Sequence, residues 1–224
     1  MRERTRWFIV VTFAVAMAWM ESATVVYLRL LVGRINPYQA DPLPVSVGLG
    51  NTELIREAAT MIMLLAAGLL AGRTWRSRLA YALIAFGVWD IFYYVFLAII
   101  SAWPRSLLDW DVLFLIPLPW WGPVLAPMLI ALLMIVGGTL VVHFDRLEHP
   151  IWPDWKVWAL NLSGVILALI IFMLPALHSL ANGTPSVRQA LPTEFYWLPF
   201  SIALLLMAAP IVDVGRKVIP VSHE

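Results

Sequence analysis

Six apolar segments, each 19 to 25 residues long, constrain the fold of this chain more than any other feature of its sequence. A helix needs roughly 20 apolar residues to cross a hydrocarbon core about 30 Å thick. A lipid-exposed span must also satisfy its own backbone hydrogen bonds, which helices do. The sequence therefore predicts an all-α, polytopic transmembrane helical bundle of about six spans. The predicted spans cover residues 7–31, 53–72, 79–101, 124–142, 156–176 and 195–214.

The composition agrees with a lipid environment. Of the 224 residues, 62% are hydrophobic and 13% are charged, and the mean hydropathy is +0.84. A soluble domain is about half apolar and about a quarter charged, and a chain this short has no interior for the excess. We expect a single transmembrane domain over residues 1–224, with the bacterial cytoplasmic (inner) membrane as its location and the lipid bilayer as its partner.

Basic residues predict the orientation. With a cytoplasmic N-terminus, ten Lys and Arg residues fall on the cytoplasmic side and five fall on or near the outer side. Cytoplasmic loops are enriched in Lys and Arg, so both termini and the turn at 73–78 are predicted to be cytoplasmic. The apolar run after Trp7 continues past Val26, beyond the 7–15 residues of a signal-peptide core. We therefore expect the first span to be an uncleaved anchor.

Several kinds of chemistry have no support in the sequence. A net charge of +1 gives no indication of a nucleic-acid partner, and the absence of Cys excludes disulfides and thiolate sites. Metalloprotease, serine-hydrolase, phosphate-loop and dinucleotide-binding motifs are absent. All four histidines fall in predicted loops or in the tail, so bis-histidine haem ligation within the membrane is not expected, and the cofactor stays open. These are His143, His149, His178 and His223.

The outer segment 103–123 differs from an ordinary loop. Its apolar run 112–116 is followed by Pro117, Pro119 and Pro123, so the segment is too short and too interrupted to span. Such apolarity predicts an interfacial or re-entrant element, with a plain surface loop as the alternative.

Two tryptophans stand apart from the other ten. Those ten fall at predicted span ends or in loops, where amphipathic rings favour the headgroup layer. Trp19 and Trp89 lie deep in the first and third spans. We expect both to pack between helices.

Three acidic residues within the spans are the candidate functional groups, because ionisable side chains in a membrane are costly and are usually functional. Glu21 and Asp90 lie at similar depth in the first and third spans, and Glu57 lies about 7 Å below the outer end of the second. Tyr93 and Tyr94 follow Asp90 at i+3 and i+4, on the same helix face. Gly87, one turn earlier, would admit a neighbouring helix.

These residues predict a buried acidic site, lined by tyrosines and open to the outer side. Such a site would bind or relay a cation, a proton or a small polar ligand, as transport proteins do. For Glu57 we also consider a structural role beside Arg56, a residue that can itself pair with Glu53.

Two other functions stay open. The first is a non-catalytic subunit whose buried polar residues fix packing with other membrane subunits. The second is an intramembrane enzyme for a lipid-like substrate, with Glu21, Glu57 and Asp90 as acid–base groups or as ligands for Mg²⁺, Mn²⁺ or Ca²⁺.

Overall fold

The computed structural model describes residues 3–33, 35–38, 47–116, 118–144, 152–181 and 194–218. The protein is mostly helical, and it has six helices long and apolar enough to cross a membrane, which agrees in number with the six predicted segments. The helices are α1 (Glu3–Leu31), α2 (Val47–Ala71), α3 (Trp75–Ser101), α4 (Leu125–Phe144), α5 (Trp155–Ala181) and α6 (Trp197–Val218).

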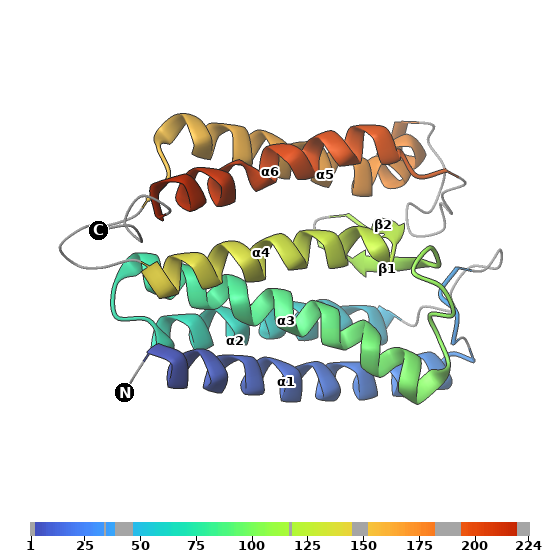
Figure 1. Ribbon diagram of the computed structural model, residues 1–224. Helices are drawn as coiled ribbons and strands as arrows, with labels where there is room; N and C mark the ends of the chain where they lie inside the picture. The colour runs from blue at the N-terminus through green and yellow to red at the C-terminus, as the bar shows by residue number, and fades with distance from the viewer. Residues whose placement is uncertain are drawn as a thin grey trace.

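The helices lie roughly along one direction and form two groups (Figure 1). Helices α1 to α4 make the larger group, in which α3 packs against α1, α2 and α4, while α5 and α6 pack against each other and α6 also packs on α4. Helix α1 begins and α6 ends at the same end of the stack. We call this the turn end, because residues 72–74 connect α2 and α3 there.

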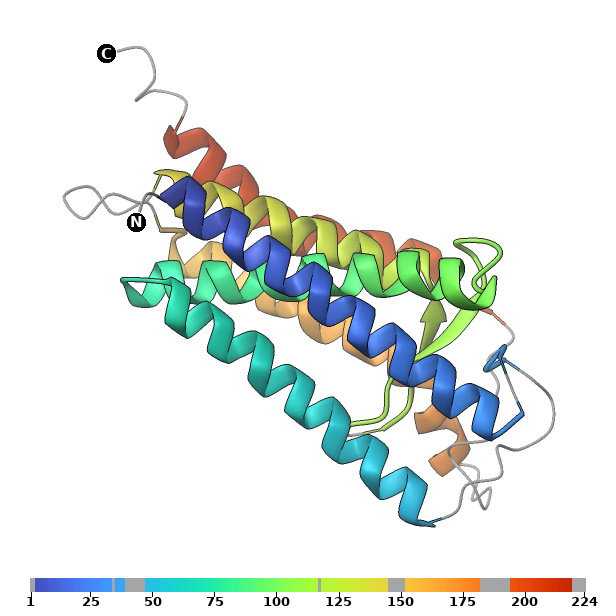
Figure 2. The same cartoon turned by 90° about the horizontal axis from the view of Figure 1, so that it is seen from below.

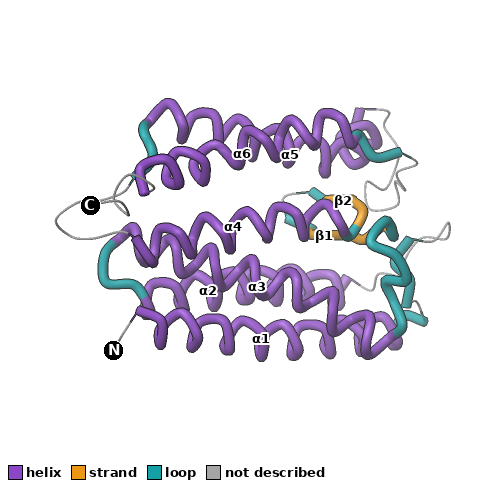
Figure 3. The backbone as a smooth tube through the Cα atoms, viewed as in Figure 1, coloured by secondary structure: helices purple, strands orange, loops and turns teal. Residues whose placement is uncertain are grey.

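The opposite end holds a short β-hairpin that an all-α fold did not predict. Strands β1 (Trp110–Phe114) and β2 (Trp120–Pro123) pair antiparallel, with Asp111 opposite Gly122 and a register shift between Val112 and Phe114. Figure 3 shows the pair beside the start of α4, and we call this the hairpin end. Pro119 directly precedes β2 and Pro123 ends it, positions at which a missing backbone donor is tolerated.

Two glycines bring α3 close to its neighbours. A Cβ at Gly87 would lie 2.5 Å from the backbone oxygen of Ala131 on α4, and a Cβ at Gly68 would lie 2.5 Å from the backbone of Ala82. The close approach predicted at Gly87 is therefore confirmed. Helices without side chains at the contact can pack backbone to backbone, which suits helices in lipid.

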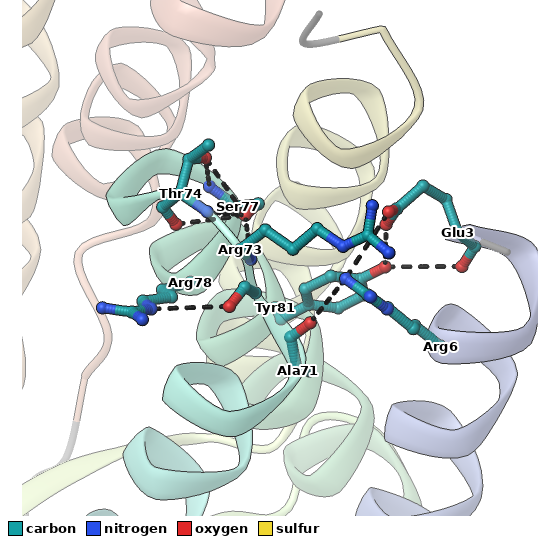
Figure 4. A network of polar contacts seen from close by, with 9 residues as sticks. Glu3, Arg6, Ala71, Arg73, Thr74, Ser77, Arg78 and Tyr81 are labelled. Atoms are coloured by element: carbon teal, nitrogen blue, oxygen red, sulfur yellow. Dashed lines mark hydrogen bonds and ion pairs between the residues drawn. The ribbon is translucent and has the colours of Figure 1, made fainter. Parts of the chain in front are cut away.

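A hydrogen-bonded cap fixes the connection between α2 and α3. Thr74 is the N-cap of α3, and its hydroxyl accepts from the Ser77 backbone N–H at 3.1 Å while Thr74 N donates to Ser77 Oγ at 2.9 Å. Figure 4 shows this cap beside the Tyr81 hydroxyl, which donates to Glu3 Oε2 at 2.9 Å. A reciprocal cap satisfies two backbone donors that the helix leaves unpaired. The turn end is thus tied to the start of α1.

The two deep tryptophans have different surroundings. Trp89 is 5% exposed and packs in the core, as predicted. Trp19 is 46% exposed, and its ring makes an edge contact with Phe96 of α3, with ring centres 5.1 Å apart. The prediction for Trp19 is wrong. Depth in a span does not determine which face of the helix a residue occupies, and an outward face of a membrane helix can carry a large apolar ring.

Candidate functional site

One cavity of about 890 Å³ lies between the two helix groups, and residues of all six helices contribute to its lining. It extends from the hairpin, which contributes residues 112–115 and 119–121, to Trp152 and Trp158 at the turn end. All five predicted site residues line it: Glu21, Glu57, Asp90, Tyr93 and Tyr94. The tertiary structure therefore brings together residues of α1, α2 and α3 around a shared space.

Glu21 is paired rather than free. Its carboxylate forms an ion pair with Arg56 of α2 and accepts from Thr60 Oγ1 at 3.2 Å. Arg56 also donates through Nε to Glu53 Oε2 at 2.9 Å, which confirms the predicted pairing within α2. Arg56 therefore bridges two carboxylates and links α1 to α2. This arrangement gives Glu21 a structural contact in addition to its place in the cavity wall.

Glu57 connects α2 to the hairpin. Its Oε2 accepts from the backbone N–H of Leu115 at 3.1 Å. Figure 2 shows the hairpin reaching across the stack toward α2. Because Leu115 directly follows β1, this bond satisfies a donor that the two-stranded sheet leaves open. The partner expected for Glu57 was Arg56, but its hydrogen bond is to the hairpin.

Asp90 is a buried acidic residue of the cavity wall, and one of its oxygens is unpaired in the described part of the chain. It is 7% exposed, and its Oδ2 atom is buried with no hydrogen-bond partner among the described residues. Tyr93 and Tyr94 lie on the same turn, with ring centres 4.9 Å apart, and Trp89 stacks on Tyr93 at 6.0 Å. Buried polar atoms are rarely left unpaired, because they lose their bonds to water. Asp111 Oδ2 and several indole nitrogens are likewise buried without a partner among the described residues, but Asp90 is the carboxyl group of this kind that lines the cavity, and it lies beside two phenols.

An ion pair between α1 and β1 completes the polar cluster. Arg29 Nη2 lies 2.9 Å from Asp111 Oδ1, and the Asp111 side chain is fully buried. The Arg29 guanidinium also lies 4.3 Å from the centre of the Trp103 ring. Burial raises the pKa of the Asp111 carboxyl, while Arg29 acts in the opposite direction.

The sequence reading did not select Arg29 and Asp111 as site residues. Asp111 lies between Trp110 and Val112 in the segment predicted to enter the membrane interface. An acid within such a segment is itself a functional signal, and it could have identified this position. Its pairing with Arg29 of α1 could not be read from the sequence, because it forms only when the hairpin folds against that helix.

The described side chains offer little support for a metal or haem site. Within the described ranges, no three His, Cys, Asp or Glu side chains are grouped to hold a metal ion. His143 and His178 lie in the last turns of α4 and α5, not in loops as predicted, and those turns are at opposite ends of the stack. His149 and His223 fall outside the described residues. The metal-dependent enzyme therefore gains no support from this geometry.

Comparisons with protein-family models, with curated proteins and with solved structures find no significant match to this chain. Toward its hairpin end, the cavity is lined by four carboxyl groups and two guanidinium groups, and the buried Asp111 pairs with one of these guanidinium groups, that of Arg29.

Proposed function

We propose that this protein is an integral membrane protein that binds a cation, a proton or a small polar ligand at the acidic, tyrosine-lined end of its cavity. The observation that carries the proposal is Asp90, a buried carboxyl whose Oδ2 has no hydrogen-bond partner in the described part of the chain. A ligand that donates to this oxygen would remove the free-energy cost of leaving it unpaired.

The residues around Asp90 have separate roles in this proposal. Tyr93 orients the ligand through its hydroxyl, and the Tyr94 hydroxyl, which is hydrogen-bonded to Asp111, holds the neighbouring wall in place. Glu57 lies at the entrance, where it also fixes the hairpin. Glu21 is matched by Arg56, so its contribution is to hold that side of the cavity in position. Asp90 is then the group whose charge responds directly to the ligand.

The membrane placement is part of the same proposal. Following the bias of basic residues, the hairpin end faces outward, both termini are cytoplasmic and the membrane is the bacterial inner membrane. The segment 103–123 is then a re-entrant or interfacial element that covers the outer end of the cavity. The whole chain acts as one transmembrane domain.

A second candidate function has its own support. The contacts of Glu21 with Arg56 and of Glu57 with Leu115 join separate elements, as expected of a subunit whose buried polar groups fix packing. A stable, stoichiometric partner after mild detergent extraction would favour this alternative.

Short photoreactive probes test the leading proposal. Diazirine-bearing propylamine and propanol would be added to the purified protein in phosphatidylcholine nanodiscs, and labelled peptides would be identified by mass spectrometry. We expect labelling of α3 and the hairpin, with a loss of roughly tenfold or more in Asp90→Asn, since a hydrogen bond to a charged group is removed. Asp154→Asn, at an exposed acid of the turn end, is the matched control. Equal labelling of wild type and Asp90→Asn would refute the proposal.

A further inference from the structure

The cavity is larger than a cation or a small polar ligand needs. Its volume of about 890 Å³ lies near the top of the range for ligand pockets, about 300 to 1,000 Å³. A water molecule takes about 30 Å³ of liquid volume, and apolar cavities of modest size stay dry. An ion at Asp90 would therefore leave most of the cavity unfilled. A larger ligand is needed to occupy the remaining volume.

The lining changes along the length of the cavity. Apart from Arg76 and Asn161 toward the turn end, the charged groups and tyrosines of the lining gather toward the hairpin end. The walls between these polar ends include Leu83 of α3, Leu133 of α4 and Val165 of α5. Arg76 lines the cavity 14 residues before Asp90, which is about 21 Å of α3 at a rise of 1.5 Å per residue. This length exceeds half of a hydrocarbon core about 30 Å thick. The apolar part can therefore hold a chain of lipid dimensions.

One side of the cavity is not closed by helix packing. Helix α2 packs on α3 and α1, and α5 packs on α6, but no extensive packing joins α2 to α5 or α6 in the described part of the chain. Both α2 and α5 nevertheless contribute to the lining, and Figure 2 shows the two helices apart. A molecule dissolved in the bilayer could therefore enter the cavity between α2 and α5, which do not pack extensively on each other in the described part of the chain.

The charges at the hairpin end restrict which polar group of a ligand can lie beside Asp90. Arg29 is engaged by Asp111, and Arg56 is engaged by Glu21 and Glu53, so neither guanidinium is left for an anion. A carboxylate or phosphate would add negative charge to a cluster in which acidic groups already outnumber basic ones. A hydroxyl or an ammonium group would instead donate to the unpaired Asp90 oxygen.

We infer that the ligand is an amphiphile whose apolar chain lies along α3 and whose hydrogen-bond-donating head, a hydroxyl or an ammonium, contacts Asp90. The inference rests on the proposed function and names the ligand class for the same site. It accounts for both ends of the cavity with one molecule, because the polar head satisfies Asp90 and the chain fills the apolar length beyond it.

Long-chain photoreactive probes test this inference in the same nanodiscs. Dodecylamine, dodecanol and dodecanoic acid would each carry a diazirine near the end of the chain. We expect the amine or the alcohol to label α4 and α5 peptides near Leu133 and Val165, at least about tenfold more than the acid. The relative yields of the amine and the alcohol identify the head group. Equal labelling by all three probes would show simple partitioning into apolar space and would overturn the inference.

Filling variants separate this inference from the proposed function. Val165→Trp places a ring in the apolar part, and Leu162→Trp places the same ring on an exposed, outward position of the same helix. We expect Val165→Trp to abolish labelling by the long probes and to spare labelling of α3 by propylamine and propanol, while Leu162→Trp changes neither. Leu133→Trp fills the cavity from α4 if Val165→Trp does not fold.

The two hypotheses fail in different ways. If the short probes label α3 in an Asp90-dependent manner and a longer chain brings no gain, the amphiphile is wrong and the polar site stands. If Asp90→Asn has no effect on short or long probes, both the polar site and the amphiphile fail.

Discussion

Arg29 of α1 and Asp111 of β1 form an ion pair 2.9 Å long at the hairpin end, and the Asp111 side chain has no exposed surface. The pair joins the first helix to a strand 82 residues later in the chain. It therefore holds the hairpin over the cavity that Asp90 lines.

Removing one member of this ion pair is expected to lower the stability of the fold. Asp111→Ala leaves Arg29 buried without its carboxylate and should lower the free energy of unfolding by about 3–5 kcal/mol. The double variant Arg29→Met/Asp111→Leu should be closer to wild type, because no unpaired charge remains. Unfolding in mixed detergent micelles measures both. As a control, Asp154→Asn at an exposed pair should cost no more than about 1 kcal/mol. Additive losses in the double variant would contradict a direct interaction.

Glu21 and Asp90 should respond differently to near-isosteric substitution. Glu21→Gln weakens the contact with Arg56 and should lower stability by about 1–3 kcal/mol. Asp90→Asn removes a carboxylate oxygen that has no partner among the described residues, so it should leave stability unchanged or raise it slightly, while reducing probe labelling. Thermal unfolding of the two variants, measured in parallel, checks this. A larger loss in Asp90→Asn would mean that Asp90 has a structural role.

Gly87 should not tolerate even a methyl group. In Gly87→Ala the new Cβ would meet the Ala131 backbone oxygen of α4, and we expect a loss of about 1–3 kcal/mol from overpacking. Gly215→Ala is the matched control, because no described atom lies within 4 Å of the position that its Cβ would take. That substitution should gain about 0.5–1 kcal/mol from the higher helix propensity of Ala. Equal stability of the two variants would argue against close packing of α3 and α4.

The proposed orientation can be tested without removing any native thiol, since the chain has no Cys. A membrane-impermeant maleimide added to intact cells should react with Arg105→Cys in the exposed segment before the hairpin. It should react with Arg73→Cys, in the turn between α2 and α3, only after the membrane is permeabilised. The reverse pattern would place the turn end outside.

The depth of the hairpin is a separate prediction. A spin label at Ile116, a half-exposed position after β1, should be shielded from aqueous nickel complexes and reached by oxygen, as expected of a re-entrant segment. A label at Arg105 should show the opposite preference. Free access of the nickel complex to position 116 would leave the segment as an ordinary surface loop.

Much of the helical architecture could be predicted because lipid imposes it locally. Span length and apolar composition are properties of consecutive residues, so the segments at 7–31 and 79–101 were found close to the bounds of α1 and α3. The depth of an acidic residue follows from its distance to the end of its span. Glu21, Glu57 and Asp90 could for that reason be selected as candidates from the sequence.

The pairing of those residues was decided by the tertiary structure alone. Span position cannot distinguish Trp19, which is half-exposed, from Trp89, which is buried, because helix rotation depends on neighbours. The same applies to Glu21, whose charge meets Arg56, and to Asp90, whose Oδ2 meets no partner in the described ranges. Hydropathy measures the free energy of transfer into lipid and carries no information on which helix faces pack against each other. The ion pair of Arg29 with Asp111 and the cavity between the two helix groups arise only when distant segments pack.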